Sequence, residues 1–246
     1  MKQSVLLFLV VAFAVSFFPG TARAVMDQKE ATHLKEEALN RNRLDLYDLR
    51  TAAHGDDLWA ENEYGVFLIQ SGKDSSRGVS WIQKAAQHNL VVAQRNMGSL
   101  YARGFVVRQN FALAAKWFRP AAVAGDQKAQ YYLGVLYERG WGVPKDPAQA
   151  LEWFRKSARQ YDPAPAYQIG RLYSGVPGIQ RNPAKAIKWF REAAIKDYAP
   201  ADLALANAYA HGDGVPKDPA RARKWFDKST HVRNGAGEFQ VVWNID

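Results

Sequence analysis

Large apolar side chains recur every 36 residues along most of the chain. A ladder of tryptophans keeps this interval, at Trp81, Trp117, Trp153, Trp189 and Trp225. A ladder of tyrosines keeps it too, at Tyr101, Tyr137, Tyr173 and Tyr209. A shared period of this length indicates a tandem array of one structural unit rather than a single irregular core.

Each unit shows the pattern of two helices joined by a turn. Its fifth residue is apolar, its sixth is small and a Tyr follows three places later, which is the spacing of one helix face. The small residue is glycine in most units, where we expect two backbones to approach closely. Glycines such as Gly140 and Gly142 allow the chain to reverse, and an Asn or Asp before Pro, as in Asp146-Pro147, is typical of a helix N-cap. The second helix carries the Trp, with two small residues four and five places later that leave room for the indole against a neighbouring helix.

The register of these units predicts the fold class. Full units begin at Ala93, Ala129, Pro165 and Ala201. An earlier unit from Ala60 is shorter, and the register places its three-residue deletion in the turn at 72–76. We therefore predict an all-α right-handed superhelical solenoid of antiparallel helix pairs, with five repeats over residues 60–236. The charged, amphipathic residues 25–59 supply an N-terminal helical cap.

The C-terminal segment 237–246 has two interpretations. Phe239, Val241, Trp243 and Ile245 alternate with polar or small residues, which is strand periodicity. Gly237, Val241 and Ile245 also continue the 36-residue register as a further first helix. We interpret the segment as a capping tail that shields the open end of the solenoid, with strand addition to a partner as the alternative.

Residues 1–24 have the layout of a secretory signal peptide. Lys2 precedes an apolar run over residues 5–18, and Ala22-Arg23-Ala24 supplies the small residues of a cleavage site. The apolar run is shorter than the roughly 20 residues that a membrane-spanning helix needs. We therefore expect cleavage after Ala24, export to the periplasm, and no membrane span after cleavage.

Composition and charge exclude several classes of protein. The 246 residues include no cysteine, which excludes a disulfide scaffold, a zinc finger, an iron–sulfur protein and a cysteine protease. The formal net charge is +9, but the basic residues fall mostly on the predicted second helices and turns, and export argues against nucleic acid as a partner. The five histidines show no metal-ligand spacing, and no nucleophile–base motif occurs. We expect no metal, no cofactor and no enzymatic activity.

The repeat pattern A-x-x-x-L-G-x-x-Y-x-x-G-x-G-V-x-x-D-x-x-x-A-x-x-W-x-x-x-A-A resembles the Sel1-like repeat, a relative of the tetratricopeptide repeat. The unit from Ala129 to Ala158 fits it nearly everywhere, whereas Val106 replaces a turn glycine and Pro165 a leading alanine. The resemblance implies a protein–protein adaptor, often in the bacterial envelope and sometimes an inhibitor of its partner. Some cysteine-rich relatives were linked to β-lactam binding, and another subset serves as periplasmic immunity proteins against type VI secreted phospholipase toxins.

By analogy with the tetratricopeptide repeat, the first helices line the concave face. The third, fourth, seventh, tenth and eleventh places of each unit then point into it and form the candidate partner-binding set: Arg95, Asn96, Ser99, Arg103, Tyr131, Tyr132, Glu138, Arg139, Tyr167, Gln168, Arg171, Asn207 and His211. Tyr and Arg together are typical of protein-binding hot spots. The alternative for Tyr131 and Tyr132 is that they fill the space between repeats.

Two further candidates, Phe105 and Trp141, occupy the same turn position in adjacent units. An aromatic side chain at a loop tip is a suitable anchor for a partner, although it could equally pack under the next loop. Together these features predict a periplasmic protein-binding repeat protein, either an inhibitor or immunity protein that occludes a partner enzyme such as a phospholipase toxin, or an envelope assembly scaffold. A β-lactam-binding enzyme is the remote alternative.

Overall fold

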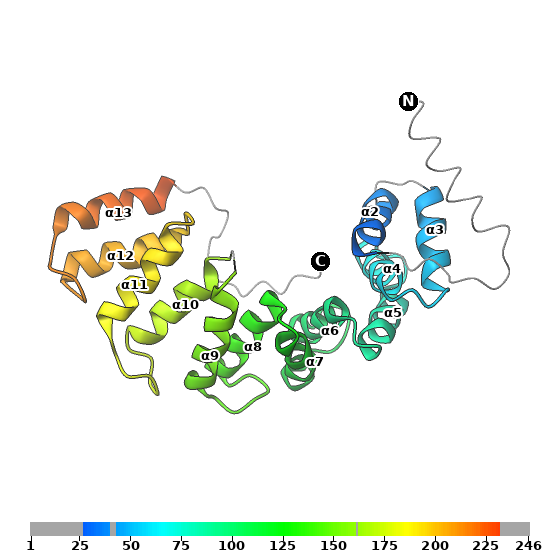
Figure 1. Cartoon of the computed structure of the whole chain (residues 1–246), viewed down its shortest axis with the longest axis horizontal. Coiled ribbons are helices and arrows are strands. Elements are labelled where there is room, and N and C mark those ends of the chain that lie inside the picture. Colours follow the sequence, from blue (N-terminus) through cyan, green and yellow to red (C-terminus); the bar gives the residue numbers. More distant parts are fainter. Residues whose placement is uncertain (1–26, 40–42, 161, 232–246) are drawn as a thin grey trace, which may run out of the picture.

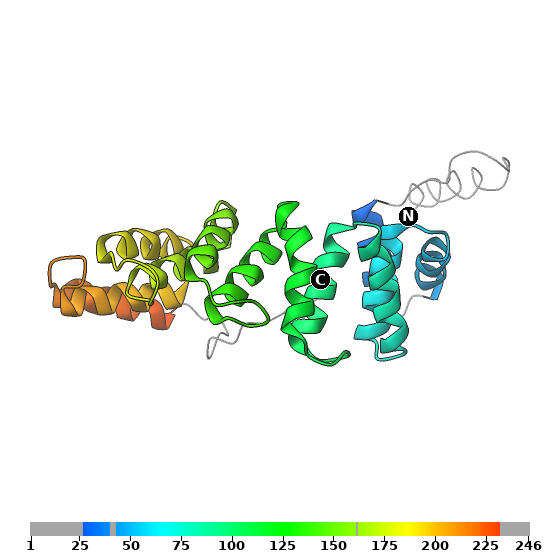
Figure 2. The same cartoon turned by 90° about the horizontal axis from the view of Figure 1, so that it is seen from below.

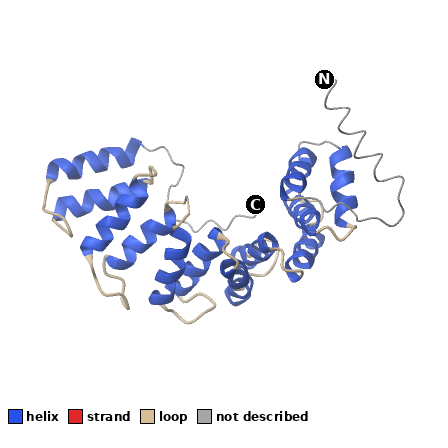
Figure 3. Ribbon diagram, in the orientation of Figure 1, coloured by secondary structure: helices blue, strands red, loops and turns tan. Residues whose placement is uncertain are grey.

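The computed structural model describes residues 27–39, 43–160 and 162–231, and these residues form an arch of helices (Figure 1). The helices are α2 (Gln28–Leu39), α3 (Arg43–Ala53), α4 (Leu58–Gln70), α5 (Ser75–Gln87), α6 (Val91–Arg103), α7 (Phe111–Val123), α8 (Gln127–Arg139), α9 (Pro147–Ala158), α10 (Ala164–Tyr173), α11 (Pro183–Ala194), α12 (Ala199–His211) and α13 (Pro219–His231). Loops connect them, with no strand within the described ranges (Figure 3). The predicted signal peptide and C-terminal tail lie outside the described residues.

Consecutive helices pack against each other as a row of pairs. Helix α4 pairs with α5, α6 with α7, α8 with α9, α10 with α11 and α12 with α13, and each pair packs on the next. Helices α2 and α3 pack against α4 at the N-terminal end, and the pairs follow one another along the long axis of the molecule (Figure 2). In the middle of the arch, the first helix α6 lies on the inner side and the second helix α7 on the outer side (Figure 1). The all-α solenoid predicted from the sequence is confirmed.

The predicted N-caps close the turn within each repeat. The side chains of Asn110, Asp146 and Asn182 accept hydrogen bonds from backbone N–H groups in the first turn of α7, α9 and α11. Their own backbone N–H groups donate to the carbonyls of ladder tyrosines, for example from Asp146 to Tyr137 over 2.9 Å. One Asx residue therefore starts the second helix and also ties it to the end of the first, which explains its fixed distance from the Tyr.

The hydroxyl groups of the tyrosine ladder join successive repeats. An arginine on each of α7, α9 and α11 donates to the Tyr of the next first helix. The pairs and donor–acceptor distances are Arg119 to Tyr137 at 2.6 Å, Arg155 to Tyr173 at 2.6 Å and Arg191 to Tyr209 at 2.8 Å. Because hydrogen bonds to charged groups are stronger than neutral ones, this series fixes the positions of the third, fourth and fifth repeats on the repeats before them.

The small residue at the sixth place has a different role from the one expected in most repeats. A Cβ atom on Gly134 would lie 2.7 Å from the ring of Phe154, and Gly98 and Gly170 face phenylalanine rings in the same way. Among the described sixth-place glycines, Gly65 alone approaches another backbone, because a Cβ on Gly65 would lie 2.6 Å from the carbonyl oxygen of Gly78. In the repeats that contain Gly98, Gly134 and Gly170, the glycine therefore accommodates an aromatic ring rather than a second backbone.

The phenylalanine that follows each ladder tryptophan takes the central core position. Phe118 and Phe154 are fully buried, whereas Trp117 and Trp153 are only partly buried. The ring that fills the space above the glycine therefore belongs to Phe, and the indole of the ladder tryptophan covers the edge of the core.

Candidate protein-binding surface

The candidate contact residues on α6 lie within the wall of the arch. Asn96 and Ser99 are fully buried, and the Asn96 amide donates to Oδ1 of Asn62 on α4 over 3.0 Å. Arg95 is 8% exposed and pairs with Asp126, the N-cap of α8, at 3.0 Å. Arg95 and Asn96 hold neighbouring first helices together, and all three side chains are buried, so they belong to the packing between repeats rather than to an exposed surface.

The polar contacts of α6 continue toward the N-terminus. Asn62 donates to Oε1 of Glu63 over 2.9 Å, and Glu63 forms an ion pair with Lys35 of α2 at 2.8 Å. All of these side chains are buried. We call Lys35, Asn62, Glu63, Asn96 and Ser99 the N-terminal polar cluster. Because buried polar groups are costly unless they find partners, the contacts of this cluster specify how α2, α4 and α6 stack.

Aromatic and amide side chains join α8 to its neighbours. Tyr132 is buried against Phe118 of α7, with 5.3 Å between ring centroids. Gln168 on α10 is also buried and donates to the hydroxyl of Tyr131 over 3.3 Å. Burial raises the pKa of Tyr131 from its ordinary value of 10.0 to about 12. Tyr132 fills the space between repeats, which is the alternative that the sequence left open for it.

Arg171 on α10 reaches across the inner side of the arch to α8. Its guanidinium donates to Oε1 of Gln168 and pairs with Glu138 at 3.3 Å. Glu138 is buried, whereas about a third of the Arg171 side chain is exposed, 32%. The buried carboxylate fixes the arginine stem and leaves part of the cation available at the surface.

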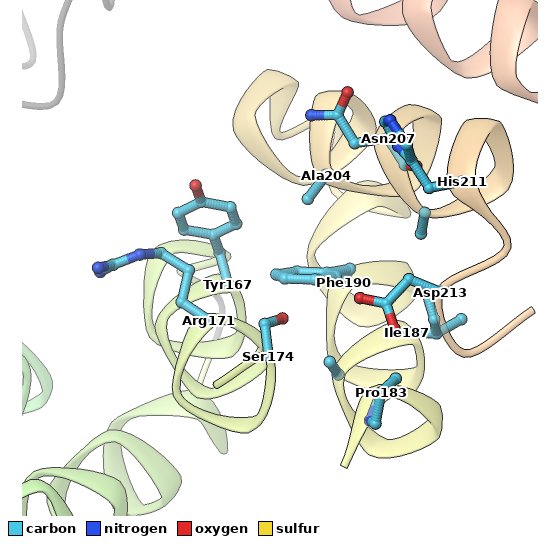
Figure 4. Close-up of a pocket in the computed structure, with 12 residues that line it drawn as sticks. Tyr167, Arg171, Ser174, Pro183, Ile187, Phe190, Ala204, Asn207, His211 and Asp213 are labelled. Carbon is cyan, nitrogen blue, oxygen red and sulfur yellow. The ribbon is translucent and has the colours of Figure 1, made fainter. Parts of the chain in front are cut away.

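The structure brings four of the candidate residues together in one pocket between α10 and α12. Tyr167 and Arg171 line it from α10, and Asn207 and His211, both exposed, line it from α12 (Figure 4). The pocket has a volume of about 350 Å³ and its floor includes Phe190 of α11. We call it the inner groove. An apolar floor with a few polar groups at the rim is the general composition of a recognition site.

The inner groove is open because of a small residue on α12. The fourth place of each unit carries Glu63, Asn96, Tyr132, Gln168 and Ala204 in turn. The first four side chains are buried and contact a neighbouring helix, whereas the methyl group of Ala204 leaves space that faces Tyr167. Tyr167 in turn packs edge-on against Tyr198 at 5.5 Å between centroids, and burial raises the pKa of both phenols.

The remaining candidates lie on the ends of the first helices and on turns. Arg103 and Arg139 are exposed, and the Arg103 guanidinium lies 5.7 Å from the ring centroid of Phe105, which is 70% exposed. Trp141, at the equivalent turn position, is 37% exposed and stacks on Phe111 at 4.9 Å. Phe105 is therefore presented to solvent, whereas Trp141 packs on the preceding repeat.

Sequence reasoning missed several residues of the inner groove. Ser174, Ala204 and Phe190 line it, as does Asp213 in the turn after α12. Asp213 also accepts a hydrogen bond from Arg181 over 2.5 Å. Ser174 stands at the tenth place of its unit, one of the places predicted to line the concave face. Ala204 could be found only by comparing the fourth places of all units and asking which one lacks a large side chain.

The described residues give no sign of metal chemistry or of a membrane span. No group of three or more His, Asp or Glu side chains within the described ranges is arranged to hold a metal ion. Among the helices that the structure describes, none combines the length and apolar character needed to cross a bilayer.

Comparison with solved structures identifies the same architecture elsewhere. A Sel1 repeat protein from Oxalobacter formigenes is 29% identical with a TM-score of 0.76, and the alignment covers 85% of this chain and 86% of that one. A protective antigen of uropathogenic Escherichia coli with an SLR fold is 31% identical with a TM-score of 0.76. The alignment covers 85% of this chain but 46% of the antigen, so this chain spans less than half of that protein.

More distant matches add no information on function. An immunity protein from Pseudomonas aeruginosa is 16% identical with a TM-score of 0.49, a level at which we draw nothing about this chain. Among curated proteins, none matches the chain. The Sel1 repeat model matches residues 60–90, 91–126, 127–162, 166–198 and 199–230, which together make up most of the sequence. With these five repeats and the shared fold, the chain belongs to the Sel1 repeat family.

Proposed function

We propose that this Sel1 repeat protein binds a partner protein at the inner groove and inhibits that partner by covering it. The observation that carries the proposal is the groove itself, where exposed Asn207 and His211 stand beside an apolar floor that includes Phe190. Sel1 repeat proteins are in general protein-interaction scaffolds. The groove combines this apolar floor with polar side chains from two neighbouring first helices.

The chemistry of the groove suits a protein segment. Tyr167 offers an aromatic face, and the exposed part of Arg171 offers a cation, and Tyr and Arg are enriched in binding hot spots. The contacts of Arg171 with Glu138 and Gln168 hold its stem in place before a partner arrives. A preformed surface loses little conformational entropy on binding, which favours the tight association that an inhibitor needs.

The partner we propose is an enzyme directed at the bacterial envelope, such as a phospholipase toxin delivered by type VI secretion. The signal-like layout of residues 1–24 supports export to the periplasm, where such a toxin acts. The family resemblance of the repeats supports an immunity role. The chain would then protect the cell by occluding the toxin.

A second candidate function, an envelope scaffold, is favoured by Phe105. Its ring is 70% exposed on the turn between α6 and α7, two repeats away from the inner groove. An exposed aromatic anchor at a separate place would allow the chain to hold two partners at once.

The experiment that tests these functions is capture of partners from the native envelope fraction by the tagged mature chain. The double variant Asn207→Asp with His211→Glu alters the groove rim, and Lys188→Glu on the exposed face of α11 is the matched charge control. One stoichiometric enzyme that is captured by the wild type and the control, lost with the double variant, and inhibited by the purified chain supports the inhibitor.

Two other results would redirect the proposal. Several envelope proteins captured together, with part of the set lost on Phe105→Ala, would support the scaffold instead. Capture of the same enzyme by the double variant with unchanged affinity would contradict the inner groove as the binding site.

A further inference from the structure

The solenoid leaves an apolar groove open at its C-terminal end. This end groove, between α12 and α13, has a volume of about 520 Å³ and is lined by Ala206, Ala210, Ala222 and Phe226 together with Asn207, Pro219 and Arg223. Phe226 is 48% exposed. A large apolar side chain left open beside a row of alanines marks a surface that lacks its packing partner.

Comparison with the earlier repeats shows what that partner would be. The residues equivalent to Phe226 are Phe118, Phe154 and Phe190, which are 0%, 0% and 5% exposed. In each of those repeats the next first helix packs on the second helix, and Tyr132 of α8 contacts Phe118 in this way. No described helix follows α13. The exposure of Phe226 therefore corresponds to one missing first helix.

The sequence after α13 continues the repeat register. Fifteen residues of the sequence follow His231. Because α12 begins at Ala199, the 36-residue period places the start of the next first helix at residue 235. Asn234 stands three periods after Asp126, the N-cap of α8, and Asn is a favoured N-cap residue. Val241 stands one period after Leu205, which is fully buried.

Helical geometry also explains the alternation of apolar residues in this segment. Residues four apart lie on one face of a helix, whereas residues two apart lie roughly 200° around it. Val241 and Ile245 would share one face, and Phe239 and Trp243 the opposite one. A pattern that resembles a strand is therefore compatible with a helix that is apolar on two sides.

We propose that residues 235–246 form a further first helix that docks Val241 and Ile245 into the end groove of the same chain. Phe239 and Trp243 then take the third and seventh places, which Tyr167 and Arg171 hold on α10. The docked segment extends the inner face of the arch by one helix, next to Asn207, which lines both grooves. The docking step involves no partner, so its test does not depend on the proposed function.

The first test uses hydrogen exchange of the α13 amides in the full mature chain. Val241→Asp puts a charge on the docking face, and Phe239→Asp puts the same charge on the opposite face as the matched control. We expect Val241→Asp and removal of residues 235–246 each to lower protection in α13 at least tenfold, and Phe239→Asp to leave it unchanged. Equal protection in the wild type and Val241→Asp would overturn the proposal.

The second test uses the absence of cysteine from the chain. Because a thiol introduced at one position is then the only thiol in the protein, its reaction rate measures the accessibility of that position. We expect the thiol introduced by Val241→Cys to react with a soluble disulfide reagent at least tenfold more slowly than the thiol introduced by Phe239→Cys. Equal rates would overturn the docking. A slow rate that speeds up on dilution, with dimers seen by light scattering, would assign the groove to a second copy and would overturn it too.

Discussion

The first helices of repeats one and two occupy the same places in their units as those of repeats four and five, but they present different inner surfaces. In the N-terminal polar cluster, Asn62, Glu63 and Asn96 reach sideways to a neighbouring helix and are buried. In the inner groove, Ala204 and Asn207 leave a pocket open above Phe190. One repeat architecture therefore yields a packed wall at one end and a recessed, partly apolar surface at the other.

The difference depends on the side chains at the third and fourth places. A long polar side chain there finds a partner on the adjacent first helix, as Asn96 does with Asn62 and Gln168 with Tyr131. Ala204 has no group that could reach its neighbour. The backbone of a repeat protein sets where a surface lies, and a few variable positions decide whether that surface is closed or available.

The largest expected effect comes from breaking the buried ion pair of the N-terminal polar cluster. Glu63→Ala removes the carboxylate that lies 2.8 Å from the ammonium group of Lys35, whose side chain is 9% exposed. Because an uncompensated buried charge is strongly unfavourable, we expect a loss of about 3 kcal/mol in the free energy of unfolding. Urea denaturation measures the loss, and limited proteolysis within α2 shows whether that helix detaches.

A matched control for this prediction is Glu152→Ala. The Glu152 carboxylate pairs with Arg155 at 3.0 Å, but 64% of its side chain is exposed. Exposed pairs contribute little, so we expect a change below about 0.5 kcal/mol. Similar losses in the two variants would show that Lys35 finds another partner or returns to solvent when Glu63 is absent.

A smaller effect is expected from giving the inner groove the side chain of a closed position. Ala204→Gln installs the residue that occupies the fourth place of the preceding repeat, where Gln168 is buried. We expect affinity for the captured partner to fall about tenfold, or about 1.4 kcal/mol, because the new side chain fills the pocket. Isothermal titration calorimetry measures this, with Ala184→Gln on the exposed side of α11 as the control. Unchanged affinity would place the partner elsewhere on the arch.

Local patterns in the sequence were sufficient to predict the fold. The 36-residue period, the Asx caps such as Asn182 and the turn glycines each act within one unit, so one sequence reveals them. Which of two adjacent aromatic residues fills the core was not predictable in this way. Phe154 and Trp153 both fit the helix face, and only the three-dimensional packing of the helices shows that Phe154 is the residue that lies against Gly134 and is fully buried.

The candidate site was predictable only in part, because contacts between repeats decide which side chains are exposed. Asn96 was assigned to the concave face by its place in the unit, but its partner Asn62 lies 34 residues away. Tyr167, Arg171, Asn207 and His211 do line one pocket. The pocket itself results from the small side chain of Ala204. A repeat pattern is defined by the residues that the units share, so it does not reveal a position at which one unit carries a smaller residue than the others.

The smallest expected effect compares two buried serines that differ in hydrogen bonding. Ser99 and Ser157 are both fully buried, but the Oγ atom of Ser99 has no hydrogen-bond partner among the described residues, whereas that of Ser157 donates to the Gln127 carbonyl over 3.0 Å. Removing an unpaired buried hydroxyl relieves a desolvation cost, while removing a paired one loses a bond and leaves its acceptor unsatisfied.

We therefore expect opposite signs from the same substitution at these two positions. Ser99→Ala should raise the free energy of unfolding by up to about 1 kcal/mol, and Ser157→Ala should lower it by about 1 kcal/mol. Chemical denaturation of the two variants side by side gives the difference directly, since both lose the same atom from a fully buried helical residue. A loss of stability in Ser99→Ala would mean that a water molecule satisfies this hydroxyl within the N-terminal polar cluster, and that this wall of the arch is hydrated rather than dry.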